Sequence, residues 1–314
     1  MAIFTLTMNP TIDINARVKQ VVPEKKLRCS DARYEPGGGG INVSRAVSKL
    51  GGTSMSLFLS GGSNGEFLRE LLEKESVENN PIPIEGSTRE NFIVLEESSD
   101  QQFRFGMPGP KVEENEWQNC LVEVEKVLTK SDYLVASGSL PAGVPADFYG
   151  RVADIGKKSG ARVIVDSTGN ALCAAVERGV FMIKPNMREL REISGRSIEK
   201  ESHIENVARQ IIENEQCEVL IVSLGAGGAF FVSDELHEHL RSPTVPIKSK
   251  VGAGDSMVAG IVYSLSEGKS LIKSAQFGVA AGAAAVMTPG TELCRKEDTE
   301  KLFKRMLKSN QLSL

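Results

Sequence analysis

The fold is decided by one short segment in the last quarter of the chain, Val251-Gly252-Ala253-Gly254-Asp255-Ser256-Met257-Val258-Ala259-Gly260. Its small residues run directly into an apolar stretch, which predicts a tight turn that opens a helix. The first N–H groups of a helix have no partner within the helix, and the helix dipole adds positive potential there. The amides of Gly252, Ala253 and Gly254 would therefore suit an anion such as a phosphoryl group in transfer. In the first turn of this helix, Asp255 fits two interpretations, a catalytic carboxylate or a helix cap.

Outward from this segment, short β-rich runs alternate with amphipathic helical patterns. The runs are Tyr133–Ala136, 162–166 and Val219–Ser223, and the helical patterns lie near Glu66–Glu75, Glu114–Leu128, Phe148–Lys158 and Ile204–Asn214. Apolar strands separated by helices predict an α/β fold with a mainly parallel central sheet flanked by helices on both faces. Because no clear linker interrupts the pattern, we expect one domain over residues 1–314.

Polar and glycine residues follow several of these strands. Examples are Ser137-Gly138-Ser139-Leu140-Pro141, Asp166-Ser167 and Ser223-Leu224-Gly225. In open α/β sheets the ligand usually binds at the carboxyl ends of the strands. The sequence therefore predicts a site at this edge.

Two segments, about 13–35 and 87–107, read as strands without crossover helices. Residues 89–96 and 101–107 flank the turn Glu97-Ser98-Ser99-Asp100, which predicts a hairpin. This is either a surface hairpin or a small β-sheet lid over the site. The two segments carry the basic residues Lys26, Arg28, Arg89 and Arg104, which would be solvated charges if separate and a phosphate clamp if they converge.

Two further clusters carry polar groups near expected helix starts. Gly37-Gly38-Gly39-Gly40 precedes Asn42, which is either a flexible loop with an Asn cap or a backbone that approaches a ligand closely. Lys184-Pro185-Asn186 precedes Glu189 by one helical turn. Oxygen ligands with that spacing suit magnesium held partly through water, and they also suit a capping box.

Composition and the remaining motifs exclude several classes of protein. A formal net charge of −4 gives no broad basic surface for nucleic acid or membrane. The glycine spacings fit neither a Walker loop nor the dinucleotide fingerprint. Five scattered cysteines and an N-terminus without a signal-peptide pattern predict a cytoplasmic protein. The three histidines, His203, His237 and His239, are expected at the surface, the last two in a turn-rich stretch.

Taken in order, these motifs resemble the ribokinase-like PfkB family of sugar kinases over nearly the whole chain. The matching pieces are Asn9-Pro10-Thr11-Ile12-Asp13, the GGGGIN block, Gly138-Ser139-Leu140-Pro141, Lys184-Pro185-Asn186 with Glu189, Ser223-Leu224-Gly225 and the GAGD helix. The stretches Pro23–Cys29 and Tyr34–Pro36 are most similar to the bacterial 6-phosphofructokinase branch. The 1-phosphofructokinase and tagatose-6-phosphate kinase branch typically has lysine where this chain has Gly39.

The resemblance implies a ribokinase-like fold with a β lid and an ATP- and Mg²⁺-dependent transfer to a sugar phosphate, foremost fructose 6-phosphate. A tagatose-6-phosphate kinase, a 1-phosphofructokinase and a non-catalytic sugar-phosphate sensor stay open as alternatives. It implies Asp255 as general base, a homodimer through the lid, and a potassium-like cation beside Ser249 and Val251. The sugar would contact Asp13, Gly38, Gly39, Asn42 and Ser139, its phosphate Lys26, Arg28, Arg89 and Arg104, and the nucleotide Lys184, Asn186, Ser223, Gly225 and Gly228.

Overall fold

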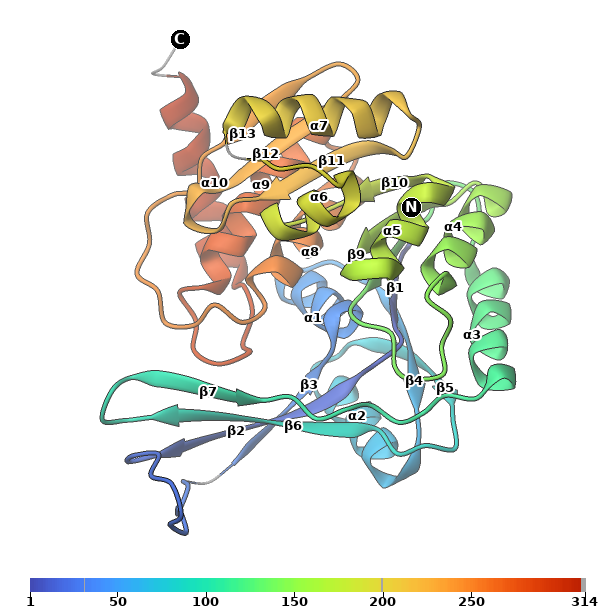
Figure 1. Cartoon of the computed structure of the whole chain (residues 1–314). Coiled ribbons are helices and arrows are strands. Elements are labelled where there is room, and N and C mark those ends of the chain that lie inside the picture. Colours follow the sequence, from blue (N-terminus) through green and yellow to red (C-terminus); the bar gives the residue numbers. More distant parts are fainter. Residues whose placement is uncertain (31, 199, 312–314) are drawn as a thin grey trace.

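The computed structural model describes residues 1–30, 32–198 and 200–311. Within these ranges the chain forms a central sheet of nine strands in the order β13-β12-β11-β10-β9-β8-β1-β4-β5 (Figure 1). The strands are β1 Ile3–Thr7, β4 Met55–Ser60, β5 Glu78–Pro83, β8 Tyr133–Ser137, β9 Arg162–Asp166, β10 Val180–Ile183, β11 Cys217–Ser223, β12 Ala229–Ser233 and β13 His237–Leu240.

Neighbouring strands from β11 to β5 pair in parallel, whereas β12 and β13 pair antiparallel at one edge. The antiparallel edge follows from the connections. Only the short 3₁₀ turn Gly225–Gly227 joins β11 to β12, and a parallel partner would need a crossover of a dozen or more residues. The predicted, mainly parallel α/β sheet is confirmed.

Helices cover both faces of this sheet (Figure 1). One layer contains α1 Gly39–Leu50, α8 Ala253–Ser266, α9 Leu271–Ala285 and α10 Lys296–Gln311, and the other contains α3 Glu114–Val127, α4 Phe148–Ser159, α5 Gly169–Arg178, α6 Met187–Ser194 and α7 Glu201–Glu213. The predicted helices near 114–128, 148–158 and 204–214 differ from α3, α4 and α7 only near their ends, and the one near Glu66–Glu75 corresponds to α2, Gly62–Lys74.

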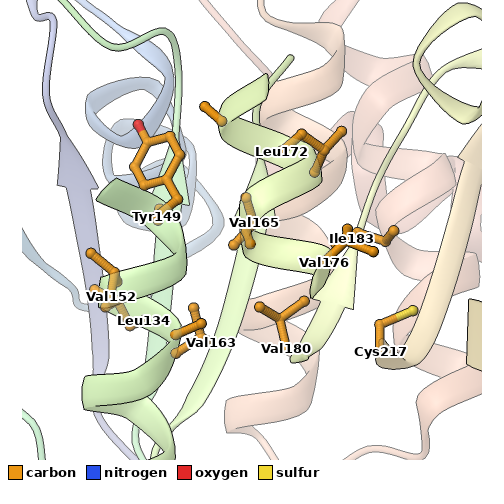
Figure 2. Close-up of a cluster of buried hydrophobic side chains, with 14 of the residues drawn as sticks. Leu134, Tyr149, Val152, Val163, Val165, Leu172, Val176, Val180, Ile183 and Cys217 are labelled. Atoms are coloured by element: carbon orange, nitrogen blue, oxygen red, sulfur yellow. The ribbon is translucent and has the colours of Figure 1, made fainter. Parts of the chain in front are cut away.

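The second layer holds the strand ends in place. Figure 2 shows Leu134, Val163 and Val165 of the sheet facing residues of α4 and α5. Beside them the fully buried Tyr149 donates a hydrogen bond from its hydroxyl to the carbonyl of Gly138, at 3.1 Å. Packing in this layer therefore fixes the loop after β8, at the carboxyl edge of the sheet.

A second sheet of four described strands extends away from the first, in the order β3-β2-β6-β7 (Figure 1). Its strands are β2 Thr11–Val18, β3 Arg33–Gly37, β6 Arg89–Glu96 and β7 Gln101–Phe105. The predicted hairpin is β6–β7, with residues 97–100 as its turn. Ile12 and Ile14 of β2 pack in a separate apolar cluster with α2, Gly62–Lys74.

The sequence prediction was wrong in two local respects. In the segment 13–35, the described residues between β2 and β3 form an exposed loop, so Lys26 and Arg28 do not lie on strands. His237 and His239 lie on β13 and not in a turn, because their strand completes the antiparallel edge. His237 is nevertheless at the surface, as expected. No described helix has the length and apolar character that crossing a membrane requires.

Candidate active site

The start of α8 meets the carboxyl edge of the large sheet and the base of the small one. A cavity of about 530 Å³ opens at this junction. It is lined by residues from both sheets and from the two helix starts: Thr11, Asp13, Gly38, Gly39, Asn42, Arg89, Asn91, Phe92, Ile93, Arg104, Phe105, Gly106, Lys250, Val251, Gly252 and Asp255. Residues that are far apart in the sequence, and that the sequence predicted as one site, therefore line one cavity.

The first turn of α8 presents backbone amides without a side-chain cap. Gly252 is the N-cap residue with φ of 73°, in the left-handed region where glycine is favoured. A Cβ at this position would also collide with the Leu293 side chain. No side chain among the described residues caps the helix, so Asp255 does not serve as its cap. The capping interpretation of Asp255 was wrong, and the helix start is free to bind an anion.

The carboxyl group of Asp255 has a pKa well above its ordinary value. It accepts a hydrogen bond of 2.8 Å from the side-chain amide of Asn42. Burial, together with the nearby negative charges of Asp166 and Asp13, raises its pKa to about 6, against the lowering effects of Asn42 and Lys184. A base is most effective when its pKa lies near the working pH.

Beside Asp255 lies a buried ion pair that the sequence only half predicted. The ammonium of Lys184 is 3.1 Å from Asp166, with 8% and 15% of the two side chains exposed. Burial alone would lower the pKa of Lys184, but Asp166, with help from Asp255 and Glu189, raises it overall. A Cβ on Gly254 would stand 3.4 Å from this ammonium, so a positive charge borders the amide cradle of α8. Asp166 was predicted only as a polar strand end, and that position was the signal for it.

On the small sheet, Asp13 faces the cavity. Its carboxylate accepts a hydrogen bond of 3.1 Å from Asn91, its partner in the parallel β2–β6 register. Burial raises the pKa of Asp13, partly offset by Asn91 and then by Arg45, Arg104 and Arg89. Asn91 was not predicted from the sequence. Its spacing of two residues from Arg89 was the available signal, because such residues share one face of a strand.

The four predicted phosphate-binding residues separate into three situations. Arg104 lines the cavity, and its guanidinium makes no hydrogen bond or ion pair with another described residue. Arg89 also lines it, but its guanidinium donates to the carbonyls of Asn9 and Met107, at 3.1 and 2.8 Å, and so ties β6 to neighbouring loops. Lys26 and Arg28 are exposed in the loop after β2 and do not line the cavity of their own chain.

Close backbone contacts explain the glycine block. A Cβ on Gly39 would collide with the hydroxyl of Ser137, at the end of β8, and one on Gly40 would stand 2.6 Å from the Leu6 carbonyl. The block is therefore packed against two strand ends and is not a flexible loop. Ser139 accepts a hydrogen bond of 3.1 Å from Asn9 and stands outside the cavity lining.

The predicted nucleotide and metal residues lie along the neighbouring strand ends. Asn186 bridges to Ser223, but its side chain caps α6, and Glu189 completes a capping box with it. Gly225 has open space around it, whereas a Cβ on Gly228 would collide with the carbonyl of Leu240. The requirement for glycine at position 228 is therefore structural. The side-chain oxygens of Asn186 and Glu189 therefore cap the start of α6. This capping box is one of the two alternatives that their spacing in the sequence left open.

The fit of these residues to the implied cations can be judged from their donor atoms. No group of three His, Cys, Asp or Glu side chains that could hold a metal occurs among the described residues. Magnesium in kinases needs no such cage, because one or two carboxylates, waters and the phosphates of the substrate complete its shell. Glu189, with one carboxylate oxygen outside the capping box, fits that demand. The Ser249 hydroxyl accepts a hydrogen bond of 3.2 Å from the Val251 amide, so these two residues form one compact turn beside α8.

Comparison with known proteins agrees with this geometry. The chain is 46% identical over 301 residues to the ATP-dependent 6-phosphofructokinase isozyme 2 of Mycobacterium tuberculosis, covering 96% of this chain and 88% of that protein. It is 30% identical over 303 residues to the 1-phosphofructokinase of Borreliella burgdorferi, covering 96% of each.

The Escherichia coli isozyme 2 is 40% identical over 302 residues, covering 96% of this chain and 97% of that protein. Its crystal structure with fructose 6-phosphate has a TM-score of 0.93, with 98% of this chain and 99% of that chain aligned. The same protein has been solved with potassium and in a tetrameric inhibited form. Residues 3–298 match the pfkB family of carbohydrate kinases, and the chain belongs to that family.

Proposed function

We propose that this chain transfers the γ-phosphoryl group of ATP to the 1-hydroxyl of fructose 6-phosphate, with Asp255 as general base. The observation that carries this proposal is the shared cavity. It brings the Asp255 carboxylate and the uncapped start of α8 together with Asp13, Arg104 and the glycine block. A hydroxyl binder, a proton acceptor and an anion cradle in one place are the parts that phosphoryl transfer needs.

In this mechanism the sugar lies on the small-sheet side and the nucleotide on the Lys184 side. Asp13 and Asn42 orient the hydroxyls of the sugar, and Arg104 and Arg89 bind its phosphate. Asp255 accepts the proton of the attacking hydroxyl. Lys184 and the amides of Gly252, Ala253 and Gly254 stabilise the charge on the transferring group, so no covalent enzyme intermediate is required.

On the nucleotide side, Lys184, Asn186, Ser223 and Gly225 contribute to the ATP site, with Gly228 fixing the turn behind it. Asn186 and Glu189 would hold magnesium through water, together with the phosphates of ATP, and the ion would supply positive charge against the phosphates. A potassium ion beside Ser249 and Val251 would support the start of α8, as the potassium complex of the Escherichia coli relative suggests.

The structure explains why this chain has glycine at position 39, where the other branch typically has lysine. A lysine in place of Gly39 would project from a Cβ that already collides with Ser137. The end of β8 would have to move to accept the lysine that is typical of the 1-phosphofructokinase and tagatose-6-phosphate kinase branch. The identity of 46% to a 6-phosphofructokinase against 30% to a 1-phosphofructokinase points the same way.

The test is ADP release with fructose 6-phosphate, tagatose 6-phosphate, fructose 1-phosphate, fructose and ribose as acceptors. We expect the highest kcat/KM for fructose 6-phosphate and a large loss for both sugars without phosphate. Preference for fructose 1-phosphate would assign the other branch. No ADP release with any acceptor would instead favour a sugar-phosphate sensor.

We also propose that the small sheet acts as a lid and pairs with a second copy of the chain. Three large apolar side chains on it, Tyr34, Phe92 and Phe105, and Met107 just after β7 are 40–48% exposed. Exposed apolar groups on one element are typical of an interaction surface. A homodimer would also place the loop with Lys26 and Arg28 near a second subunit. Sedimentation of the wild type and of Phe105→Ser tests this, and a monomer in both would contradict it.

A further inference from the structure

A buried arginine behind the cavity has no role in the proposal above. Arg45 lies on α1 with 1% of its surface exposed and is among the largest fully buried side chains. Its guanidinium donates two hydrogen bonds, of 2.9 and 2.7 Å, to the carboxylate of Glu75 at the end of α2. A buried charge is costly unless it is paired and fully hydrogen-bonded, so the contacts with Glu75 offset the cost of burying Arg45.

The remaining nitrogen of Arg45 contacts three separate segments. Nη1 donates to the carbonyl of Pro36 at 2.8 Å, to that of Thr291 at 3.3 Å, and to the side-chain oxygen of Asn42 at a long 3.5 Å. Pro36 lies near the end of the lid strand β3, Thr291 lies in the loop after α9, and Asn42 lies in the first turn of α1. Because the guanidinium is planar and rigid, it holds Pro36, Thr291 and Asn42 in fixed positions relative to one another.

Arg45 and Asp255, on two sides of Asn42, favour the same orientation of its side-chain amide. A side-chain amide has an acceptor oxygen and a donor nitrogen, and either end can face a given neighbour. Since Arg45 is a donor only, it selects the oxygen of Asn42. The NH₂ group must then face Asp255, which it does at 2.8 Å. With the amide reversed, the oxygen of Asn42 would face the acceptor oxygen of Asp255, and its NH₂ group would face the donor guanidinium of Arg45.

We propose that Arg45 is a positioning residue for the transfer: held by Glu75, it orients the Asn42 amide toward Asp255 and fixes the base of the lid against the loop after α9. This rests on the proposed function of Asp255. Arg45 does not touch the substrate, so it acts through Asn42. Of the three arginines that lower the pKa of Asp13, Arg45 has the largest effect, so it also supports the sugar-binding carboxylate.

The expected sign of the effect follows from the groups around Asp255. Asp166, Lys184 and Asp13 act on its pKa, and Lys250 lines the same cavity. A change at Arg45 leaves those charges in place. It removes the constraint that keeps the Asn42 hydrogen bond, which lowers the pKa of Asp255, and it also removes the positive charge that lowers the pKa of Asp13. Loss of the Asn42 hydrogen bond should move the acidic limb of the kcat/KM profile to higher pH.

The experiment is a double-mutant cycle with Arg45→Met, Asn42→Ala and the double variant. We expect Arg45→Met to lower kcat by about tenfold or more, and the double variant to lose no more than about twofold beyond Asn42→Ala, because residues that act through one contact are not additive. We also expect the acidic limb for Arg45→Met to rise. The phosphate of the substrate titrates in the same range. Because the substrate phosphate titrates identically with every variant, the shift of the acidic limb is taken as the difference between each variant and the wild type.

Controls separate positioning from mere stability. Arg69→Met removes an exposed arginine paired with Glu73 on α2 and should leave the profile unchanged. Circular dichroism confirms folding, and if Arg45→Met is unfolded, Arg45→Lys takes its place, with partial recovery expected. Carboxyl NMR titration of Asp255 in the substrate-free protein should show the same rise in pKa without any turnover. Additive losses in the cycle, or an unchanged Asp255 titration, would overturn the proposal, whereas an inactive wild type would instead count against the proposed function.

Discussion

Replacing Asp255 with Asn should make the protein more stable while it loses activity. Asn has the same shape and can still accept the hydrogen bond from Asn42, so the change removes little besides the charge. In the folded protein, burial and then Asp166 disfavour that charge and raise the pKa from 3.8 to about 6. We expect kcat to fall by roughly 10²–10⁴ if the carboxylate is the general base.

The size of the stability gain follows from proton linkage. Between its ordinary pKa of 3.8 and about 6, the unfolded chain has released the proton of Asp255 while the folded chain still holds it. The folded state of the wild type therefore loses stability as pH rises through this window. A difference of about two pH units corresponds to about 3 kcal/mol, present in full above pH 6 and absent below about pH 3.5. In a chain of this size, that equals about 5 °C in Tm.

The assay is thermal unfolding of wild type and Asp255→Asn at several pH values, alongside ADP release. The curves should coincide at acid pH and separate toward pH 7. Asp234→Asn, an exposed carboxylate between β12 and β13, serves as control and should show no such separation. Equal Tm values at pH 7 would refute the buried-charge reasoning, and near-normal turnover would remove Asp255 from the role of base.

Other expectations follow from single contacts. Arg104→Ala should raise KM for fructose 6-phosphate by about 10–100-fold, because it removes a hydrogen bond to a charged group. KM for unphosphorylated fructose should stay unchanged, and an equal effect on both sugars would contradict the phosphate contact. Lys184→Met leaves Asp166, whose side chain is 15% exposed, without its partner. It should cost about 1–3 kcal/mol of stability and weaken ATP binding; calorimetry measures both, and unchanged values would argue against the ion pair. Gly228→Ala should lower Tm by several degrees through the clash with the Leu240 carbonyl, yet leave KM for ATP in the folded fraction nearly unchanged.

Much of the fold was determined by the sequence alone. The alternation of β-rich and amphipathic runs predicted the parallel sheet and its two helical layers, because hydrophobic periodicity is a local property. The β6–β7 hairpin was predicted from its turn residues for the same reason. The loop between β2 and β3 was not, since charged residues beside a strand give no signal for where pairing ends.

The sequence by itself also predicted the helix start at α8 with Asp255 in its first turn, because small residues before a helix and the charge of Asp255 need no distant partner to be recognised. Only the tertiary structure decided which residues lie around Asp255 and contact one another there. The pairing of Lys184 with Asp166, the facing of Asn91 and Asp13 across a parallel register, and the contact of Arg45 with Asn42 depend on strand order and helix packing. Lys184 and Asp166, and Asn91 and Asp13, are far apart in the sequence, and Arg45 meets Asn42 only in one orientation of the Asn42 side chain. Neither composition nor spacing encodes which of these groups come into contact.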